Sequence, residues 1–482
     1  MDYSTNTSVT DNFATGRQEA YPSPWLLAAS CLPMLLLSFF LMRDQGTKIP
    51  YLNPKKRFEW SSARAVQEII FDARQKLYRS ASGVLGKPFR VLSDVGDVII
   101  LPPQFGQEIR NDKRFSFTQR LFEDFQGRYA GFEAYKEATH QSGRLQNVVK
   151  LRLTKTLGKI TGILSKEAET TIQHTLTDSK GYWHEVVLKE VILDTVSAMS
   201  GRIFVGERLG HNKQWLQTVI DYVELSLVAM QSMRMWPEVL RSIVVWFLPG
   251  PTRLRAYVRD AERLISAELK MRKEESYSAE YEDAIEWFAE VAKGEKYNPA
   301  VCQLILGSVA VHTTADLITQ TVYDILQHPE LIEPLREEVI RVIGEGGWKK
   351  TSLHNLKLMD SVLKESQRLK PAQIGSSGPS LVQPALDPPR VLTYSLVGMS
   401  RSVTANVELS DGTKLARGSN IAVSAERMWD PEVYENPLEF DGYRFFRERG
   451  GPNDAANQLV STGISHMGFG HGMHSCPGRF FA

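Results

Sequence analysis

The residues best suited to chemistry lie in one short run near the C-terminus, FGHGMHSCPG, from Phe469 to Gly478. A cysteine thiolate binds a haem iron well in a loop whose backbone amides approach the sulfur, because amide donors stabilise the negative charge. Glycines in such a loop permit tight turns and close backbone approach, and proline restricts the exit. The run has three glycines, Gly470, Gly472 and Gly478. It predicts that Cys476 is the axial ligand of a haem iron, with Phe469 shielding the sulfur from water.

Two alternatives fit the same run. It could be a glycine-rich loop with a structural cysteine, or it could contribute to a zinc site. The candidate zinc ligands are His466, His471, His474 and Cys476. Zinc accepts mixed histidine and cysteine ligands, but this spacing matches none of the usual ligand pairs.

The run resembles the haem-binding pattern of the cytochrome P450 superfamily, F-x-x-G-x-x-x-C-x-G. The four fixed positions are filled by Phe469, Gly472, Cys476 and Gly478. The resemblance implies haem b held through the Cys476 thiolate in a loop that includes Gly470. It also puts His474 where the family often has a basic residue against a haem propionate.

A second part of the resemblance lies in Glu365-Ser366-Gln367-Arg368, which matches the family's E-x-x-R. Residues three apart share a helix face, so Glu365 and Arg368 can form a unit, although an exposed ion pair is the commoner reason for that spacing. The segment FDGYRF, from Phe440 to Phe445, resembles the one that brings a second arginine, here Arg444. We expect a structural role, since losing one partner of a buried carboxylate costs roughly 3–5 kcal/mol.

A third part is Val309-Ala310-Val311-His312-Thr313-Thr314, which aligns with the family's oxygen-activating helix signature. The resemblance assigns Thr313 to hold a water that delivers protons during oxygen activation. His312 replaces the usual acid, so it is either part of an imidazole proton path or a packed core residue. Val309 stands where a small residue is usual. This variant resembles certain fungal enzymes that oxidise terpenoids and related secondary metabolites.

Composition limits the partners. Lys plus Arg (57) nearly balances Asp plus Glu (56), so no charge field argues for nucleic acid. Hydrophobic residues make up 42% of the chain, enough for a large core and an apolar small-molecule site. Three distant cysteines, Cys31, Cys302 and Cys476, exclude a disulfide framework and favour a reducing compartment.

The N-terminal region predicts a membrane anchor over residues 25–42, WLLAASCLPMLLLSFFLM. This uncharged run of about 18 residues approaches the thickness of a bilayer core, about 30 Å. Only Arg17 precedes it, whereas several basic residues follow, so the catalytic body should face the cytosol. We expect a single-pass protein of the endoplasmic reticulum membrane, with residues 1–24 in the lumen and 43–58 as a linker.

The elements that must position these residues follow from periodicity and turn signals. We expect a hairpin at 89–94 and 97–103, a helical region at 104–271, and a helix from Pro299 to about Leu326 that Asn298 caps. Further helices are expected at 60–78 and 359–369, with strands between Val403 and Val423. The fold class is mostly α with minor β, the haem-thiolate fold, over residues 59–482.

Two features depart from the family pattern. Residues 375–398 form an atypical insertion rich in Pro, Gly and Ser, which an unspliced intron would explain. The chain ends at Ala482, where family members continue, which suggests a truncated C-terminal end.

The sequence thus predicts a cytochrome P450 monooxygenase that uses O2 and electrons from an NADPH-cytochrome P450 reductase to oxidise an apolar, terpenoid-like substrate in fungal secondary metabolism. The alternatives are an inactive haem-binding pseudo-enzyme or truncated gene product, and a zinc-binding membrane protein.

Overall fold

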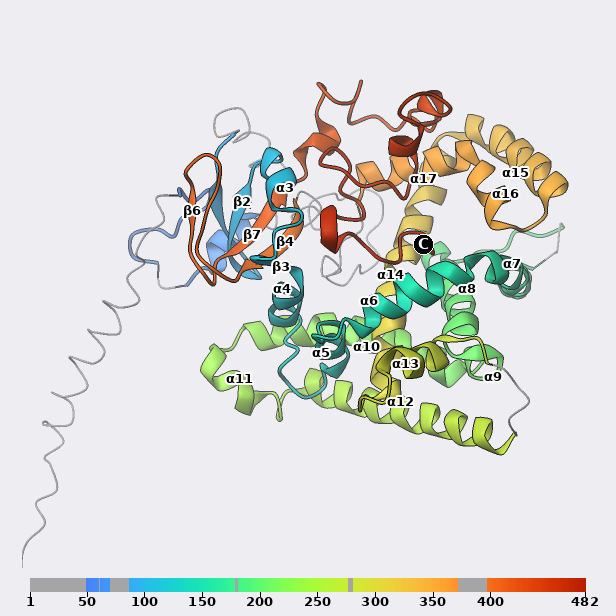
Figure 1. The fold of residues 1–482 in the computed structure, drawn as a ribbon, viewed down its shortest axis with the longest axis horizontal. Helices are drawn as coiled ribbons and strands as arrows, with labels where there is room; N and C mark the ends of the chain where they lie inside the picture. The colour runs from blue at the N-terminus through green and yellow to red at the C-terminus, as the bar shows by residue number, and fades with distance from the viewer. Residues whose placement is uncertain (1–48, 60, 70–85, 178–180, 276–280, 372–396) are drawn as a thin grey trace, which may run out of the picture. The chain divides into compact units, whose positions relative to one another are not determined.

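The computed structural model describes residues 49–59, 61–69, 86–177, 181–275, 281–371 and 397–482 (Figure 1). Within it, Ile49–Ala482 is one compact unit. The expected luminal tail (1–24), the anchor (25–42) and the first part of the linker (43–48 of 43–58) lie outside the described residues. The helix expected at 60–78 is described only at 61–69, and residues 63–69 are helical.

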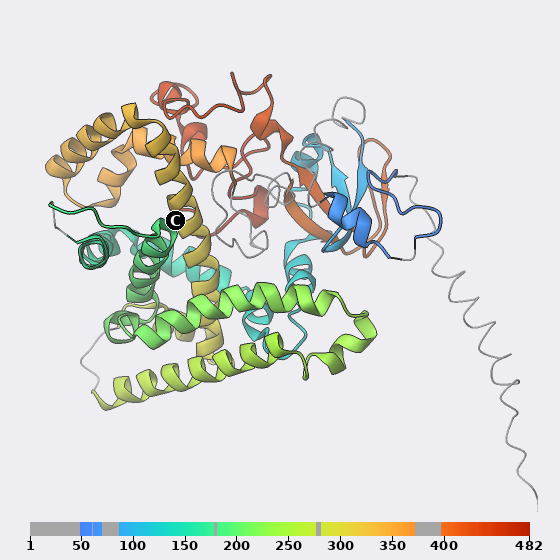
Figure 2. The same cartoon turned by 180° about the vertical axis from the view of Figure 1, so that it is seen from behind.

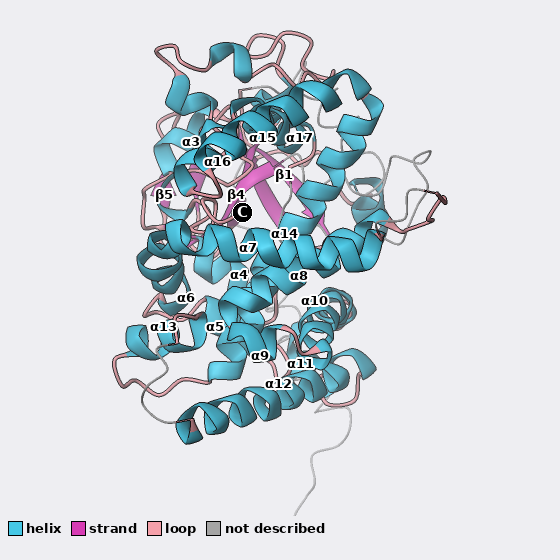
Figure 3. Cartoon of the chain, turned by 90° about the vertical axis from the view of Figure 1, so that its right-hand side faces the viewer, coloured by secondary structure: helices cyan, strands magenta, loops and turns pink. Residues whose placement is uncertain are grey.

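The described part is mostly helical (Figure 3), and its small sheet lies at one side of the helical body (Figure 1). Its α-helices carry the labels of Figure 1. They are α3 (Gln104–Ile109), α4 (Phe117–Asp124), α5 (Glu133–Ala138), α6 (Arg144–Val148), α7 (Thr154–Leu176), α8 (Leu188–Phe204), α9 (Gly206–Gly210), α10 (Lys213–Arg234), α11 (Glu238–Val244), α12 (Pro249–Glu274), α13 (Ala284–Ala292), α14 (Pro299–Gln327), α15 (Ile332–Gly346), α16 (Lys350–Asn355) and α17 (Lys357–Leu369). A π-helical turn, Val149–Leu153, joins α6 to α7.

The main sheet has the strand order β1-β2-β7-β4-β3. Its strands are β1 (Phe89–Ser93), β2 (Gly96–Leu101), β3 (Phe115–Ser116), β4 (Val397–Val403) and β7 (Asn420–Ser424). The expected hairpin is confirmed, since β1 pairs antiparallel with β2, with Phe89 opposite Ile100. β2 runs parallel to β7, while β4 is antiparallel to both β7 and β3.

The strands expected between Val403 and Val423 are present as two strands joined by a turn at Ser410-Asp411-Gly412, and the region also includes most of β7. Besides β7 it forms a separate two-stranded ladder, β5 (Val407–Glu408) with β6 (Lys414–Leu415). The boundary of the expected 375–398 insertion is also corrected, because Val397 and Gly398 already belong to β4 and pair with β7. The remaining residues of that insertion, 375–396, lie outside the described residues.

Helix α14 passes through the middle of the helical body, where α8, α10, α12 and α5 pack against it (Figure 2). The Asn298 side chain caps its first turn by accepting from the amides of Ala300 and Val301, as its sequence signal predicts. Of the helices in the described ranges, α14 alone is long and apolar enough to cross a bilayer, yet most of that apolar stretch is buried. It is therefore a core helix, whose burial in the largest apolar cluster fixes the middle of the molecule.

Candidate functional site

The cysteine loop is closed by its own backbone. The amide of Cys476 donates to the carbonyl of Phe469 at 2.8 Å, which draws the two ends of the run together. Inside it, the amide of Ser475 donates to Gly472 at 3.0 Å. The loop therefore presents Cys476 at its exit, immediately before Pro477.

Backbone donors also converge on the cysteine sulfur. Burial raises the pKa of the Cys476 thiol, while hydrogen bonds from the backbone amides of Gly478 and Arg479 and the charge of Arg479 lower that pKa. Amide donors and a nearby cation are the groups that stabilise a thiolate. A Cβ added at Gly478 would make only ordinary contacts, 3.8 Å from Val149 and 3.9 Å from the sulfur, so this approach does not depend on the missing side chain.

The chain just after α3 packs against the cysteine loop. Gly472 has φ +77°, and a Cβ on it would lie 2.4 Å from the carbonyl oxygen of Arg110. The next amide, that of Met473, donates to the same Arg110 carbonyl at 3.1 Å and to Asn111 Oδ1 at 3.0 Å. Gly472 is thus the point where the loop touches the N-terminal half of the fold.

The three histidines near the loop do not converge with Cys476 on one point. His466 is buried, with Nε2 3.3 Å from the carbonyl of Lys364, and His471 has Nε2 3.1 Å from Gln107 Oε1. No set of three metal-ligating side chains occurs among the residues that the structure describes. The zinc alternative is therefore wrong for this part of the chain, because two of its ligands are bonded in different directions.

His474 lies in a group of cations instead. Burial, followed by the charges of Arg401 and Lys150, lowers the pKa of His474 to about 4. Its ring lies 6.0 Å from that of Phe117, over which the Arg401 guanidinium also sits at 5.3 Å. Three basic side chains therefore lie close together: Arg401 from β4, Lys150 from the π-helical turn and His474 from the cysteine loop.

Arg401 is the residue in this group that sequence reasoning missed. It is only 3% exposed, and burial lowers its pKa to about 10. Its guanidinium donates to the carbonyl of its neighbour Ser400, and no carboxylate of the described chain pairs with it. A buried, uncompensated guanidinium is costly, so this arrangement fits an anionic ligand. The one signal in the sequence is a single charged residue inside an otherwise uncharged strand.

Thr313 and His312 lie on different faces of α14. Residues 301–308 are buried, but Val309, Ala310, Thr313 and Thr314 are partly exposed, which marks an open side of the helix. The Thr313 hydroxyl donates to the carbonyl of Val309 at 2.9 Å. In Figures 1 and 2 the C-terminal end of the chain lies beside this helix. Val309 and Ala310 pack on the apolar cluster that also contains Val149. Val149 in turn faces Gly478 of the cysteine loop.

His312 is directed toward α8 and α10. Burial lowers its pKa, while Asp316 raises it and Lys189 lowers it further. A hydrogen bond to the backbone of Ile220 also favours its protonated form, although its Nε2 has no partner in the described chain. Lys189 and Asp316 form an ion pair of 3.3 Å that is about half open to solvent.

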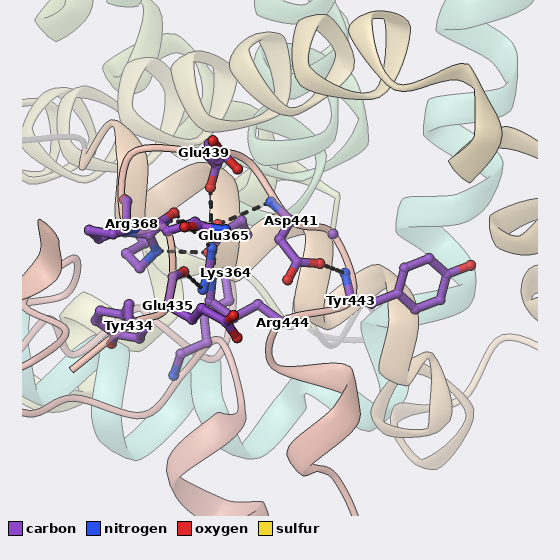
Figure 4. A network of polar contacts seen from close by, with 12 residues as sticks. Lys364, Glu365, Arg368, Tyr434, Glu435, Glu439, Asp441, Tyr443 and Arg444 are labelled. Carbon is purple, nitrogen blue, oxygen red and sulfur yellow. Dashed lines mark hydrogen bonds and ion pairs between the residues drawn. The ribbon is translucent and has the colours of Figure 1, made fainter. Parts of the chain in front are cut away.

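Glu365, Arg368 and Arg444 come together in one buried network (Figure 4). The guanidinium of Arg368 binds both carboxylate oxygens of Glu365 at 2.8 Å, and Arg444 Nε donates to Glu365 Oε1 at 3.0 Å. The side chains of Glu365 and Arg368 are fully buried. The exposed ion pair considered for Glu365 and Arg368 is therefore wrong.

This network connects α17 to the cysteine loop. Arg368 also donates to the carbonyls of Met428 and Pro437, both at 2.6 Å, and lies over the ring of Tyr434. Tyr434 in turn donates its hydroxyl to the carbonyl of Ser465, the residue before His466. The chain that leads into the cysteine loop is thus fixed on the same groups that neutralise Glu365.

Known proteins resemble this chain both in sequence and in fold. A family model described as "Cytochrome P450" matches residues 75–375 and 390–482. The chain is 44% identical over 406 residues to cytochrome P450 monooxygenase 1 of Gibberella fujikuroi, covering 82% of this chain and 87% of that one. It is 40% identical to cytochrome P450 monooxygenase hepE of Aspergillus oryzae, covering 97% of this chain and 83% of the relative. The fold is similar to the crystal structure of the cytochrome P450DA haem domain, with a TM-score of 0.62, 15% identity and coverage of 90% and 87%.

We predict that Arg444→Ala lowers the free energy of unfolding by roughly 3–5 kcal/mol, because it leaves a buried carboxylate short of one cation. Arg447→Ala is the matched control. Arg447 pairs with Asp441 in the same segment but is 58% exposed, so its loss should cost no more than about 1 kcal/mol. Guanidinium unfolding followed by tryptophan fluorescence measures both. Equal losses in the two variants would contradict the structural role of Arg444.

A second prediction separates two glycines of the loop. Gly470→Ala and Gly472→Ala both place a side chain at positive φ, which costs about 1–2 kcal/mol. Only Gly472→Ala also drives a Cβ into the Arg110 backbone, since the nearest atom to a Cβ at Gly470 is 3.7 Å away. Haem content per protein and melting temperature should therefore fall much further in Gly472→Ala. Equal behaviour of the two variants would show that contact with Arg110 does not shape the loop.

Proposed function

The chain belongs to the cytochrome P450 family and is a haem-dependent monooxygenase, and from that membership we propose that Cys476 is the axial ligand of its haem b iron. The observation that carries the proposal is the convergence of the Gly478 and Arg479 amides on the Cys476 sulfur in a closed loop. Phe469, Gly470, Gly472 and Gly478 shape that loop. The inactive haem-binding alternative has no support among the relatives, which are named monooxygenases.

The residues around the loop fit a haem. Arg401, His474 and Lys150 are a set of basic groups that lack a carboxylate in the described chain, and haem carries two propionates. We assign Arg401 as the main propionate partner, with His474 and Lys150 beside it. An anion there would also raise the pKa of His474, whose imidazole could then donate a charged hydrogen bond. Bound at this place, the haem would supply the oxidising chemistry that inserts one oxygen atom of O2 into a C–H bond while the other leaves as water.

The open face of α14, which carries Thr313, would provide the groups that handle protons. Thr313 is proposed to hold a water at its hydroxyl, because the hydroxyl proton is already donated to Val309 and its oxygen remains free to accept. A water held there can pass protons toward the reacting oxygen. Ala310 leaves space beside Thr313, whereas the bulkier Val309 narrows it.

Protons would reach Thr313 from the surface through His312. Asp316 and Lys189 form a partly exposed ion pair, and the charges of both act on the imidazole of His312. Its lowered pKa keeps His312 neutral at neutral pH, the form that can accept a proton on one nitrogen and release one from the other. The competing role is that of a packed core histidine bonded to Ile220.

P450 monooxygenases act on small molecules with a redox partner, and for this chain we propose an NADPH-cytochrome P450 reductase in the endoplasmic reticulum membrane. The apolar run at 25–42 would anchor the protein there with its catalytic domain in the cytosol. We propose an apolar, terpenoid-like substrate in fungal secondary metabolism. The V-A-V-H-T-T variant and the near-neutral charge support this, since capture of such a substrate depends on apolar burial.

The ligand assignment is tested by the spectrum of the reduced protein with carbon monoxide. Wild type and Cys302→Ala should both show the red-shifted Soret band of thiolate ligation, whereas Cys476→Ala should lose it. Cys302 is the matched control because it is fully buried in the helical core, where burial raises its pKa. An unchanged spectrum in Cys476→Ala would overturn the assignment.

The proton path is tested by the ratio of product formed to NADPH consumed. Thr313→Ala should keep haem content and substrate affinity but divert reducing equivalents to hydrogen peroxide, since a positioned proton donor is worth about 10²–10⁴-fold. Thr319→Ala is the control, because its hydroxyl makes the same bond to the preceding turn at 2.7 Å but lies on a buried part of α14. Normal coupling in Thr313→Ala would remove the hydroxyl from the mechanism.

His312→Ala distinguishes the two roles of that residue. If His312 is part of a proton path, His312→Ala should show the same uncoupling that we expect of Thr313→Ala, at a nearly unchanged melting temperature. A packing role predicts a lower melting temperature with coupling preserved. The same two measurements therefore decide between them.

A further inference from the structure

Five arginines are buried in the described part of the chain, and one of them has no role in what precedes. Arg144, Arg272 and Arg368 each donate two or more hydrogen bonds to carboxylates. Arg401 belongs to the basic group that we assign to a haem propionate. Arg120, in α4, is the one that remains. It is 4% exposed, so bulk water does not satisfy its charge.

The guanidinium of Arg120 makes an ion pair but no hydrogen bond within the described residues. Its Nε lies 2.8 Å from Oδ2 of Asp124, one turn further along α4, yet this nitrogen is sealed from solvent without a hydrogen-bond partner. A guanidinium has five N–H donors in a fixed plane. Since leaving buried charged donors unpaired is unfavourable, Arg120 calls for an acceptor that the described chain does not supply.

The charges around Arg120 are already balanced, which limits the kind of acceptor. Burial raises the pKa of Asp124 to about 6, against the charges of Arg120 and Arg234, which lower it. Arg234 has partners of its own, because it donates to the carbonyl of Asp124 at 2.7 Å and to Asp94 Oδ2 at 3.4 Å. Two arginines thus face two aspartates. A further carboxylate would lack a cation of its own, so the acceptor that fits is a neutral oxygen.

The position of Arg120 connects it to the proposed haem site. Helix α4 extends from the sheet toward α10 (Figures 1 and 2). Phe117 begins α4 and lies under the guanidinium of Arg401, with its ring 6.0 Å from that of His474. Arg120 comes three residues later on the same face, about 5 Å further along the helix axis. Beyond it, Arg234 belongs to α10, which packs on α14. Arg120 therefore lies between the proposed edge of the haem and the helix that covers α14.

We propose that Arg120 is a specificity-determining residue, which donates a hydrogen bond to a hydroxyl or carbonyl oxygen of an otherwise apolar substrate. The proposal rests on the terpenoid-like substrate proposed above and narrows it to molecules that already carry one oxygen. An analogue without that oxygen would leave the buried donors unpaired, which is how a polar contact in an apolar site rejects the wrong molecule. A reaction that installs the oxygen must then come before this one.

The test compares three probes of one carbon skeleton on the haem-loaded full chain: farnesol, the hydrocarbon farnesene and farnesoic acid. Dissociation constants come from the ligand-induced shift of the Soret band at neutral pH, so turnover is not needed. Wild type should bind farnesol about 10–100-fold more tightly than farnesene, because a hydrogen bond from a charged donor is among the stronger ones. Arg120→Leu should bind the two equally, and Arg120→Lys should keep part of the preference.

Two further variants control for folding and for charge. Arg120→Leu combined with Asp124→Asn leaves no unpaired carboxylate, so it tests the same loss where the single variant does not fold. Arg128→Leu is the matched control. Arg128 is 48% exposed and pairs with Glu238 at 2.9 Å, so its loss should leave the preference for farnesol unchanged.

Equal affinities for farnesol and farnesene in wild type, or an undiminished preference in Arg120→Leu, would overturn the role of Arg120. Tightest binding of farnesoic acid would overturn the neutral oxygen, and loss of haem from Arg120→Leu at the wild-type melting temperature would make Arg120 a haem contact instead. A wild-type protein with the thiolate spectrum that binds none of the probes overturns the terpenoid-like substrate and this inference with it. Loss of the thiolate spectrum itself would overturn the haem site.

Discussion

The buried carboxylate of Glu365 is the group on which the haem-side half of this structure depends. A carboxylate with no solvent contact is unfavourable unless cations and donors replace its water. Here Arg368 supplies two bonds, Arg444 a third and the amide of Asp441 a fourth. Because Arg368 comes from α17 whereas the other two groups come from a loop about 75 residues later, neutralising one charge fixes two distant parts of the chain.

That constraint continues into the site through neighbouring residues of α17. The ammonium of Lys364 donates to the carbonyls of Ala456 and Gln458, and its own carbonyl accepts from His466. Burial lowers the pKa of Lys364 to about 8, so the charge on this ammonium depends on those carbonyls and on the nearby Asp360. A Cβ at Gly468 would clash with the side chain of the buried Gln367, which would have to move to admit a larger residue. One face of one short helix therefore positions the whole approach to Cys476.

The parts that sequence reasoning predicted are those whose causes are local. The β1 and β2 hairpin, the Asn298 cap and the E-x-x-R turn each depend on residues within a few positions of one another. What it missed depends on contacts between residues that are far apart in the sequence. Gly472 meets Arg110, and Arg401 meets His474, only because the sheet brings β4 and α3 against the C-terminal loop. The direction of His312 was equally unpredictable, since either face of α14 could have been the packed one.

The exceptions to ordinary protein chemistry in this chain mark where partners of another kind belong. The buried carboxylate of Glu365 has its cations, and the buried Arg272 has Asp283 and Glu268, so these networks are complete within the protein. Arg401 has no such partner within the described part of the chain, and it lies near His474, in the same loop as Cys476. Natural sequences break such rules mainly where function requires it. An uncompensated cation implies an anion, and the two propionates of a haem held beside Cys476 would supply that charge.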